Sequence, residues 1–161
     1  MGSEVSSGNR VFVSNRFLRI KLNLRNIQSI AKRVLAQLQY RKTDLNVVFF
    51  SDPALMKLNQ KYLHHAWATD VLAFPYTGSE RPRREFRSRH FLGEVLIASH
   101  QAKMNAKRFE TSFENELMRY MIHGILHLKG FRDNTVRKKA QMSQKENELL
   151  AIVAHKIGKI L

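Results

Sequence analysis

Two histidines and an aspartate near the end of a long apolar segment are the residues of this sequence best suited to bind a metal ion. Between residues 120 and 128 there is no charged residue, and His123 and His127 are the only strongly polar side chains. A helix of this composition is apolar on nearly every side, so we expect it to be buried. Residues four positions apart share one helix face, which lets the two imidazoles converge on a single ion.

A glycine and an aspartate after this helix complete the predicted site. Gly130 stands where a helix C-terminus favours a left-handed residue, and the turn there can bring Asp133 back over the histidine face. Catalytic zinc sites take three protein ligands and keep one position for water. We therefore predict one divalent metal ion, expected to be zinc, bound by His123, His127 and Asp133. Two structural histidines bonded to backbone carbonyls or water are the alternative, which the spacing alone leaves open.

The residue after the first histidine helps to decide which reaction the site could catalyse. In HExxH metalloproteases that residue is a glutamate that acts as general base, whereas here it is Gly124, so peptide hydrolysis of that kind is not expected. A metal ion that activates water and stabilises charge on phosphate fits phosphodiester hydrolysis, although the motif itself supplies no base. Glycine inside a helix costs about 1 kcal/mol relative to alanine. We expect Gly124 to lie where the sheet packs closely against the helix.

The charge balance indicates the class of partner. The chain has 28 Lys and Arg against 13 Asp and Glu, a formal charge of +15, which suits contact with RNA, DNA or an anionic membrane. Five arginines fall within residues 81–90, with Phe86 and Phe91 nearby to stack on unpaired bases. A solvated loop without function is the alternative. The predicted RNA-binding residues are Arg81, Arg83, Arg84, Arg87 and Arg89.

The elements that must position these residues follow from periodicity and capping signals. We predict strands at residues 11–15, 45–50, 71–74 and 94–98, and helices at residues 27–38, 53–62 and 99–108. Thr111 and Glu114 form a capping box at the start of the histidine helix, and Asn134 or Thr135 caps a last amphipathic helix. The residues of that last helix expected to face the core are Met142, Leu149, Val153 and Ile157.

This order of elements predicts an α+β fold with a small mixed sheet of about four strands, covered by helices, and a central buried helix carrying HxxxH. We expect one domain over residues 10–161, after a disordered lead over residues 1–9. The chain has no cysteine, no apolar run of membrane-spanning length and no secretion signal. We therefore predict a cytoplasmic protein without membrane contact, and expect a monomer.

Four motifs in this sequence resemble those of the YbeY family. Residues 123–131, HGILHLKGF, are similar to that family's HGxLHLxG(Y/F) signature, and residues 69–75, TDVLAFP, to its TDVLSFP strand. Residues 58–62, LNQKY, and 92–97, LGEVLI, resemble its LNxxY and LGDI segments. The resemblance implies the same α+β architecture. It also implies a metal-dependent, single-strand-specific endoribonuclease acting in ribosomal RNA maturation and ribosome quality control, with ribosomal RNA and the ribosome or small-subunit precursors as partners.

Two positions depart from the family pattern. The third metal ligand of the family is usually a histidine, where this sequence has Asp133, and the arginine that usually follows LNxxY is replaced by Leu63. A carboxylate is a competent zinc ligand, but it leaves the metal less Lewis-acidic. We therefore assign no catalytic residue beyond the metal ligands, and the alternative function is a non-catalytic RNA- or ribosome-binding assembly factor with a structural metal. A DNA-binding domain lacks support, because no helix-turn-helix or zinc-finger pattern is present.

Overall fold

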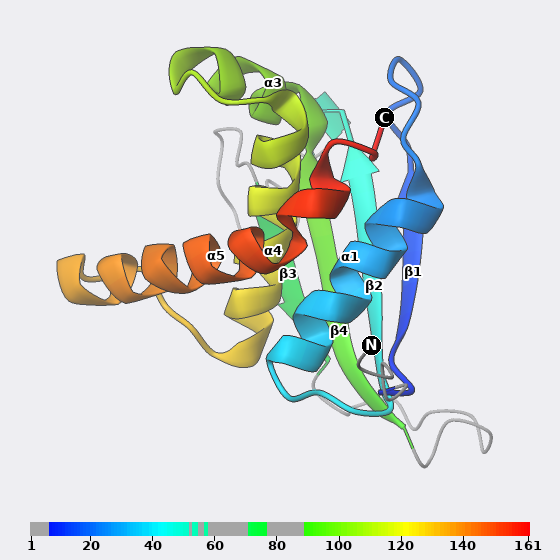
Figure 1. The fold of residues 1–161 in the computed structure, drawn as a ribbon, viewed down its shortest axis with the longest axis vertical. Helices are drawn as coiled ribbons and strands as arrows, with labels where there is room; N and C mark the ends of the chain where they lie inside the picture. The colour runs from blue at the N-terminus through cyan, green and yellow to red at the C-terminus, as the bar shows by residue number, and fades with distance from the viewer. Residues whose placement is uncertain (1–6, 52, 55–56, 58–70, 77–88) are drawn as a thin grey trace.

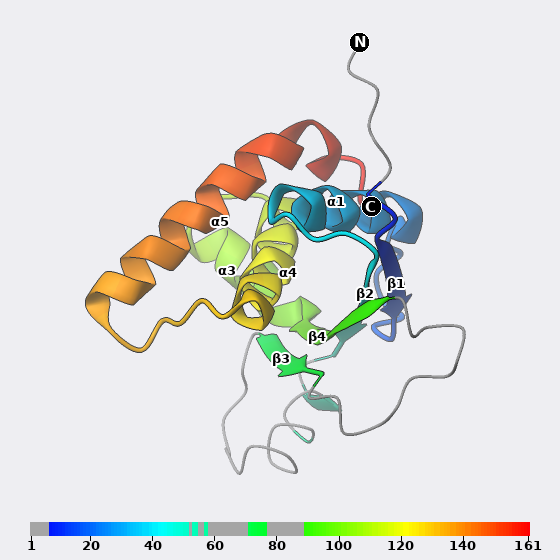
Figure 2. The same ribbon diagram turned by 90° about the horizontal axis from the view of Figure 1, so that it is seen from below.

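The computed structural model describes residues 7–51, 53–54, 57, 71–76 and 89–161. Within these residues, four strands form one sheet and four helices lie on one side of it (Figures 1 and 2). This arrangement confirms the predicted α+β class. The elements in chain order are β1 (Arg10–Asn15), α1 (Leu24–Gln37), β2 (Thr43–Phe50), β3 (Val71–Pro75), β4 (His90–Ala98), α3 (Ser99–Arg108), α4 (Phe113–Lys129) and α5 (Val136–Ile157).

The sheet is mixed, as predicted, with strand order β1-β2-β4-β3. Strands β1 and β4 both run parallel to β2, whereas β3 pairs antiparallel with β4 at the edge. The register places Val47 of β2 between Val13 and Val95. Strand β2 is almost entirely buried, which agrees with its continuous apolar sequence and its inner position between β1 and β4.

Helix α4 is the central helix of the molecule. It contacts β3 and β4 on one side and α1, α3 and α5 on the others (Figure 2). The structure confirms the close packing predicted at Gly124, where an added Cβ would lie 2.4 Å from Val95 Cγ1 and 3.0 Å from Val71 Cγ1. Only a residue without a side chain fits this contact between α4 and the sheet.

Helix α5 packs its predicted apolar face against the core. Met142, Leu149, Val153 and Ile157 are all buried, while the first turns of the helix are exposed and extend beyond the sheet (Figure 1). The helix begins after Thr135, whose Oγ1 accepts a hydrogen bond from the Lys138 amide at 3.2 Å. Within the described residues, no helix is long and apolar enough to cross a membrane.

Several predicted boundaries differ from the structure by one to four residues; α1 begins at Leu24 rather than at residue 27, and β2 at Thr43 rather than at residue 45. The cap of α4 is Ser112, not Thr111: Ser112 Oγ accepts from the Asn115 amide at 3.0 Å, and the Thr111 hydroxyl accepts from the Asn115 side chain instead. Strand β4 begins at His90 rather than at residue 94, because residues 90 and 91 continue the pairing with the start of β2. Pairing with a partner strand extended β4 beyond the residues whose composition favours a strand.

Other predictions concern residues outside the described part of the chain. Most of the helix predicted at residues 53–62 lies there, as does Leu63; residues 53, 54 and 57, which are described, are helical. The boundary between a disordered lead and a single domain stays a prediction. The side chain of Asn9, at the end of that lead, is buried; it donates to the Tyr40 carbonyl at 2.9 Å and accepts from the Thr43 amide at 3.1 Å.

Candidate metal centre

The model brings the three predicted metal ligands together at the C-terminal end of α4. The Nε2 atoms of His123 and His127 are 3.0 Å apart, and Asp133 Oδ2 lies 3.7 Å from the first and 3.6 Å from the second. One ligand atom from each residue thus lies within 4.8 Å of the other two. Two imidazole nitrogens and a carboxylate oxygen form a competent ligand set for zinc.

The local sequence explains this convergence. The helical repeat places His123 and His127 on one face of α4, one turn apart. Gly130 then ends the helix with a φ of 112°, a left-handed conformation that glycine adopts without strain. The amides of Gly130 and Phe131 donate to carbonyls of the last turn, so the chain reverses tightly and Asp133 reaches the histidines. The reversal predicted from Gly130 is therefore confirmed.

The hydrogen bonds of the two rings determine which nitrogen faces the site. His123 Nδ1 lies 2.5 Å from Glu146 Oε1, and His127 Nδ1 lies 3.1 Å from the Phe131 carbonyl oxygen. Both partners only accept hydrogen bonds, so each neutral ring carries its proton on Nδ1 and leaves an Nε2 lone pair. Two lone pairs cannot bond each other at 3.0 Å, whereas a cation between them would satisfy both. The residues therefore fit a divalent metal ion.

Burial is the main influence on the charge of His127. It lowers the pKa of the imidazole below its ordinary value of 6.5, and the neighbouring His123 and Arg132 lower it further. Asp133 and the Phe131 carbonyl act in the opposite direction but do not outweigh the burial. His127 is therefore neutral at pH 7, and the neutral imidazole is the form that binds a metal.

The sequence analysis did not identify Glu146 as a site residue. It lies on the buried face of α5, where its carboxylate contacts His123 Nδ1 and lies 3.6 Å from Arg119 Nη1. Its position four residues after Met142 and three before Leu149 places a carboxylate within the apolar stripe of that helix. A charged residue at a core position was the available signal, because such residues are buried only with partners.

The structure describes only one of the five predicted RNA-binding arginines, and RNA binding by all five stays a prediction. Arg81, Arg83, Arg84 and Arg87 lie outside the described residues. Arg89 is described, and its guanidinium donates to Asp44 Oδ1 at 2.9 Å and to the Gly8 carbonyl at 2.6 Å. With its side chain only 18% exposed, Arg89 holds the N-terminal segment against β2.

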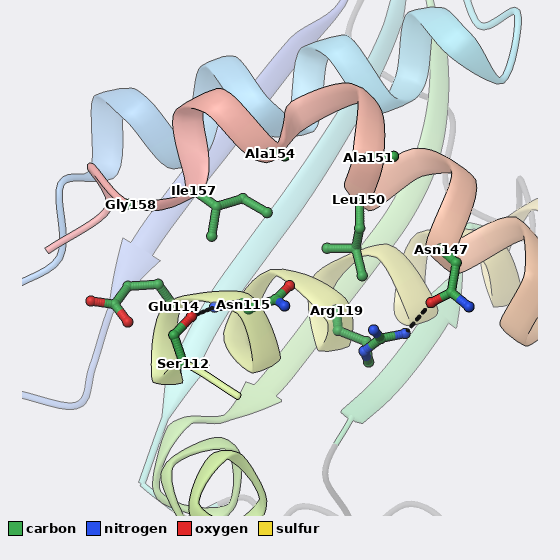
Figure 3. A pocket seen from close by; sticks show the side chains of 10 residues that line it. All are labelled: Ser112, Glu114, Asn115, Arg119, Asn147, Leu150, Ala151, Ala154, Ile157 and Gly158. Atoms are coloured by element: carbon green, nitrogen blue, oxygen red, sulfur yellow. Dashed lines mark hydrogen bonds between the residues drawn. The ribbon is translucent and has the colours of Figure 1, made fainter. Parts of the chain in front are cut away.

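A shallow groove of about 650 Å³ lies between the first half of α4 and the second half of α5 (Figure 3). Its lining includes Leu150, Ala151 and Ala154, and Arg119 Nη1 donates to Asn147 Oδ1 at 2.9 Å within it. None of the three predicted metal ligands lines this groove. The metal centre is therefore separate from the groove, near the other end of α4.

Comparison with known proteins agrees with this geometry. The family model of endoribonuclease YbeY matches residues 12–154. The chain is 34% identical over 131 residues to the endoribonuclease YbeY of Chloroherpeton thalassium, covering 80% of this chain and 86% of the relative. It is 36% identical over 109 residues to that of Christiangramia forsetii, covering 68% and 70%.

A solved structure supports the same fold. The solution structure of a Thermotoga maritima protein superposes with a TM-score of 0.56 at 23% sequence identity, covering 91% of this chain and 92% of that one. The family match spans both histidines, Asp133 and most of the elements that position them. The chain is therefore a member of the YbeY endoribonuclease family.

Proposed function

We propose that this protein is a metal-dependent endoribonuclease that cleaves single-stranded regions of ribosomal RNA during ribosome maturation and quality control. Membership of the YbeY family supports the endoribonuclease activity. The proposed cofactor is one zinc ion bound by His123, His127 and Asp133. The proposed setting is the cytoplasm, where a monomer acts on the ribosome or its small-subunit precursors.

One observation carries the proposal: two imidazole Nε2 lone pairs and a carboxylate oxygen converge, with both Nδ1 protons already engaged. A bound divalent ion supplies a water of lowered pKa and stabilises charge that develops on the phosphate. The protein residues hold the ion, and burial keeps the pKa of His127 below its ordinary value, which favours the neutral form that binds a metal. Asp133, 45% exposed, keeps one side of the ligand set open to solvent and so to an RNA strand.

The surface charge supports an RNA substrate. The exposed residues after α4 and in the first turn of α5 include four cations, Arg132, Arg137, Lys138 and Lys139, and one acid, Asp133. No ion pair to Arg132 or Arg137 is found in the described part of the chain. Cations on this surface favour phosphate contacts that weaken as salt rises. Strand specificity is consistent with a site on an open surface, which an unpaired strand can approach from several directions.

The second candidate function is a non-catalytic RNA- or ribosome-binding factor with a structural metal. Asp133 favours it, because a carboxylate ligand leaves the ion less Lewis-acidic than a third histidine would. Leu63, at the position where the family usually has an arginine, favours it as well. The two functions differ in a single observable, metal-dependent cleavage of RNA.

The ligand assignment is tested through Asp133. We expect Asp133→Ala to weaken zinc binding by more than about 100-fold and to abolish cleavage, because the ion loses a direct ligand. Asp133→His, which supplies an imidazole in its place, should retain the ion. Glu148→Ala, which removes an exposed carboxylate of α5 outside the site, is the matched control and should bind zinc as the parent does. Unchanged zinc affinity in Asp133→Ala would place the third ligand elsewhere.

A further inference from the structure

A chain of charged side chains links α4 to α5 directly behind His123. Glu116 Oε1 lies 3.5 Å from Arg119 Nε, and Arg119 Nη1 lies 3.6 Å from Glu146 Oε2. The other oxygen of Glu146 lies 2.5 Å from His123 Nδ1. The side chains of Glu116 and Glu146 are only 7% and 9% exposed, so two carboxylates are nearly buried between these helices.

Packing alone does not explain this choice of residues. Glu146 lies among the buried residues Met142, Leu149 and Leu150 of α5, where an apolar side chain would fill the same space. Burial of a carboxylate is costly even when it is paired, and an apolar replacement of a buried ion pair is often neutral or stabilising. Position 146 therefore needs a polar contact that an apolar side chain cannot make.

That requirement is an acceptor for His123 on a side chain that also carries a negative charge. One oxygen of Glu146 accepts from His123 Nδ1–H, and the other forms an ion pair with the Arg119 guanidinium at 3.6 Å. Among the side chains of similar size, only a carboxylate does both. His127 obtains its acceptor from the Phe131 backbone within its own turn, whereas His123 depends on a side chain from another helix.

We propose that Glu146 is a positioning residue for the metal centre, with Arg119 and Glu116 holding its carboxylate in place. It fixes His123 with the proton on Nδ1 and Nε2 directed at the metal position. This role rests on the metal centre of the proposed function. It also makes the docking of α5 against α4 a condition for a complete ligand set, because the acceptor behind His123 comes from α5.

The charge of the network suits a divalent ion. Carboxylates lie on both sides of His123, with Glu146 Oε1 2.5 Å from Nδ1 and Asp133 Oδ2 3.7 Å from Nε2. A hydrogen bond from a ligating imidazole to a carboxylate also raises the basicity of the nitrogen that binds the metal. Glu146 thus raises metal affinity both by orientation and by charge.

The first test observes His123 directly in metal-free protein. Nitrogen-15 NMR of the histidine rings should show the Nδ1–H tautomer at His123 in the parent. Glu146→Ala should shift it toward Nε2–H, the form that free imidazole favours, while His127 stays unchanged. Glu148→Gln, an exposed change two residues away, is the control and should leave both rings as in the parent. An unchanged His123 tautomer in a folded Glu146→Ala would overturn the assignment.

The second test measures zinc affinity in the same variants by competition with a chromogenic chelator. We expect Glu146→Ala to weaken zinc binding by roughly 10- to 100-fold, the range typical of residues that orient a metal ligand. Glu146→Gln should lie between Ala and the parent, since its amide oxygen can still accept from His123 but its side chain has lost the charge that pairs with Arg119. Glu146→Leu repeats the test with the space filled, should Ala unfold. Parent-like zinc affinity in all three variants would overturn the proposal.

Both readouts are independent of RNA cleavage. If the parent binds zinc through His123 but cuts no RNA, the proposed function fails while the role of Glu146 stands. If the parent cleaves RNA and Glu146→Ala keeps both the tautomer and the zinc affinity, the role of Glu146 fails while the proposed function stands.

Discussion

Replacement of Gly124 tests whether α4 is held against the sheet as closely as the structure shows. A Cβ at this position would lie 2.4 Å from Val95 Cγ1, where ordinary contact begins at 3.4 Å, so the substitution needs a shift of about 1 Å. Val71 Cγ1 and Val95 Cγ2 lie 3.0 and 3.2 Å from the added Cβ, so the new methyl group cannot move away from Val95 Cγ1 without approaching them. The neighbouring valines cannot all move aside without disturbing the sheet.

The expected change in the free energy of unfolding is the difference between two opposing effects. Alanine gains about 1 kcal/mol over glycine from helix propensity. Overpacking of a well-filled core costs typically about 1–3 kcal/mol, and contact with three methyl groups places this site at the upper end. We therefore expect Gly124→Ala to lower the free energy of unfolding by about 2 kcal/mol, and Tm by roughly 4–8 °C for a chain of this length.

A double-mutant cycle in urea denaturation isolates the contact. Val95→Ala alone should cost about 2 kcal/mol through the cavity it leaves. In the Gly124→Ala protein, Val95→Ala should cost much less, because the methyl group added at position 124 occupies the cavity that Val95→Ala leaves. Gly158→Ala is the matched control: no atom lies within 4 Å of its added Cβ and its φ is −64°, so stability should not fall. Equal costs of Val95→Ala in both backgrounds would refute the packing argument.

Three further predictions concern charge. Burial raises the pKa of Asp44, but the hydrogen bonds and charges of Arg10 and Arg89 outweigh it and hold the pKa below its ordinary value of 3.8. The resulting stability is present above about pH 4 and is lost as pH falls through the lowered pKa, so Asp44→Asn should remove it, at a cost of about 2 kcal/mol by urea denaturation. Arg89→Met should lower stability in the same assay and leave RNA affinity unchanged in a gel-shift titration; weakened RNA binding at unchanged stability would contradict this. In metal-free protein, NMR titration should place the midpoint of His127 below 6.5, because burial disfavours its charged form.

Several features of the fold were predictable because one local cause decides each of them. The spacing of His123 and His127 and the glycine at position 130 are sufficient to predict the face, the helix end and the reversal toward Asp133. Gly124 is similar, because glycine inside an apolar helix has few explanations besides close packing. The start of the last helix is predicted to within one residue, at Asn134 or Thr135, and Thr135 is the cap.

Features that depend on distant partners were not predictable in the same way. Thr111 and Ser112 both offer hydroxyl groups next to the start of α4, and only the path of the chain after α3 selects Ser112. Arg89 looks like part of an arginine-rich loop until Asp44, 45 residues away, is placed beside it. In the sequence, Glu146 is a charged residue at a helix position that should face the core, and its partner His123 lies on another helix. Its role requires the packing of α4 against α5.

The central claim is that the centre formed by His123, His127 and Asp133 cuts RNA with a bound metal ion. The most direct measurement incubates the purified protein with a fragment of ribosomal RNA, beside a chelated sample and the His127→Ala variant. His155→Ala, which removes an exposed histidine of α5, serves as the control. We predict cleavage by the parent and by His155→Ala, with none in the chelated sample or in His127→Ala. Salt-sensitive RNA binding in every sample without cleavage in any would contradict the account and favour a non-catalytic assembly factor.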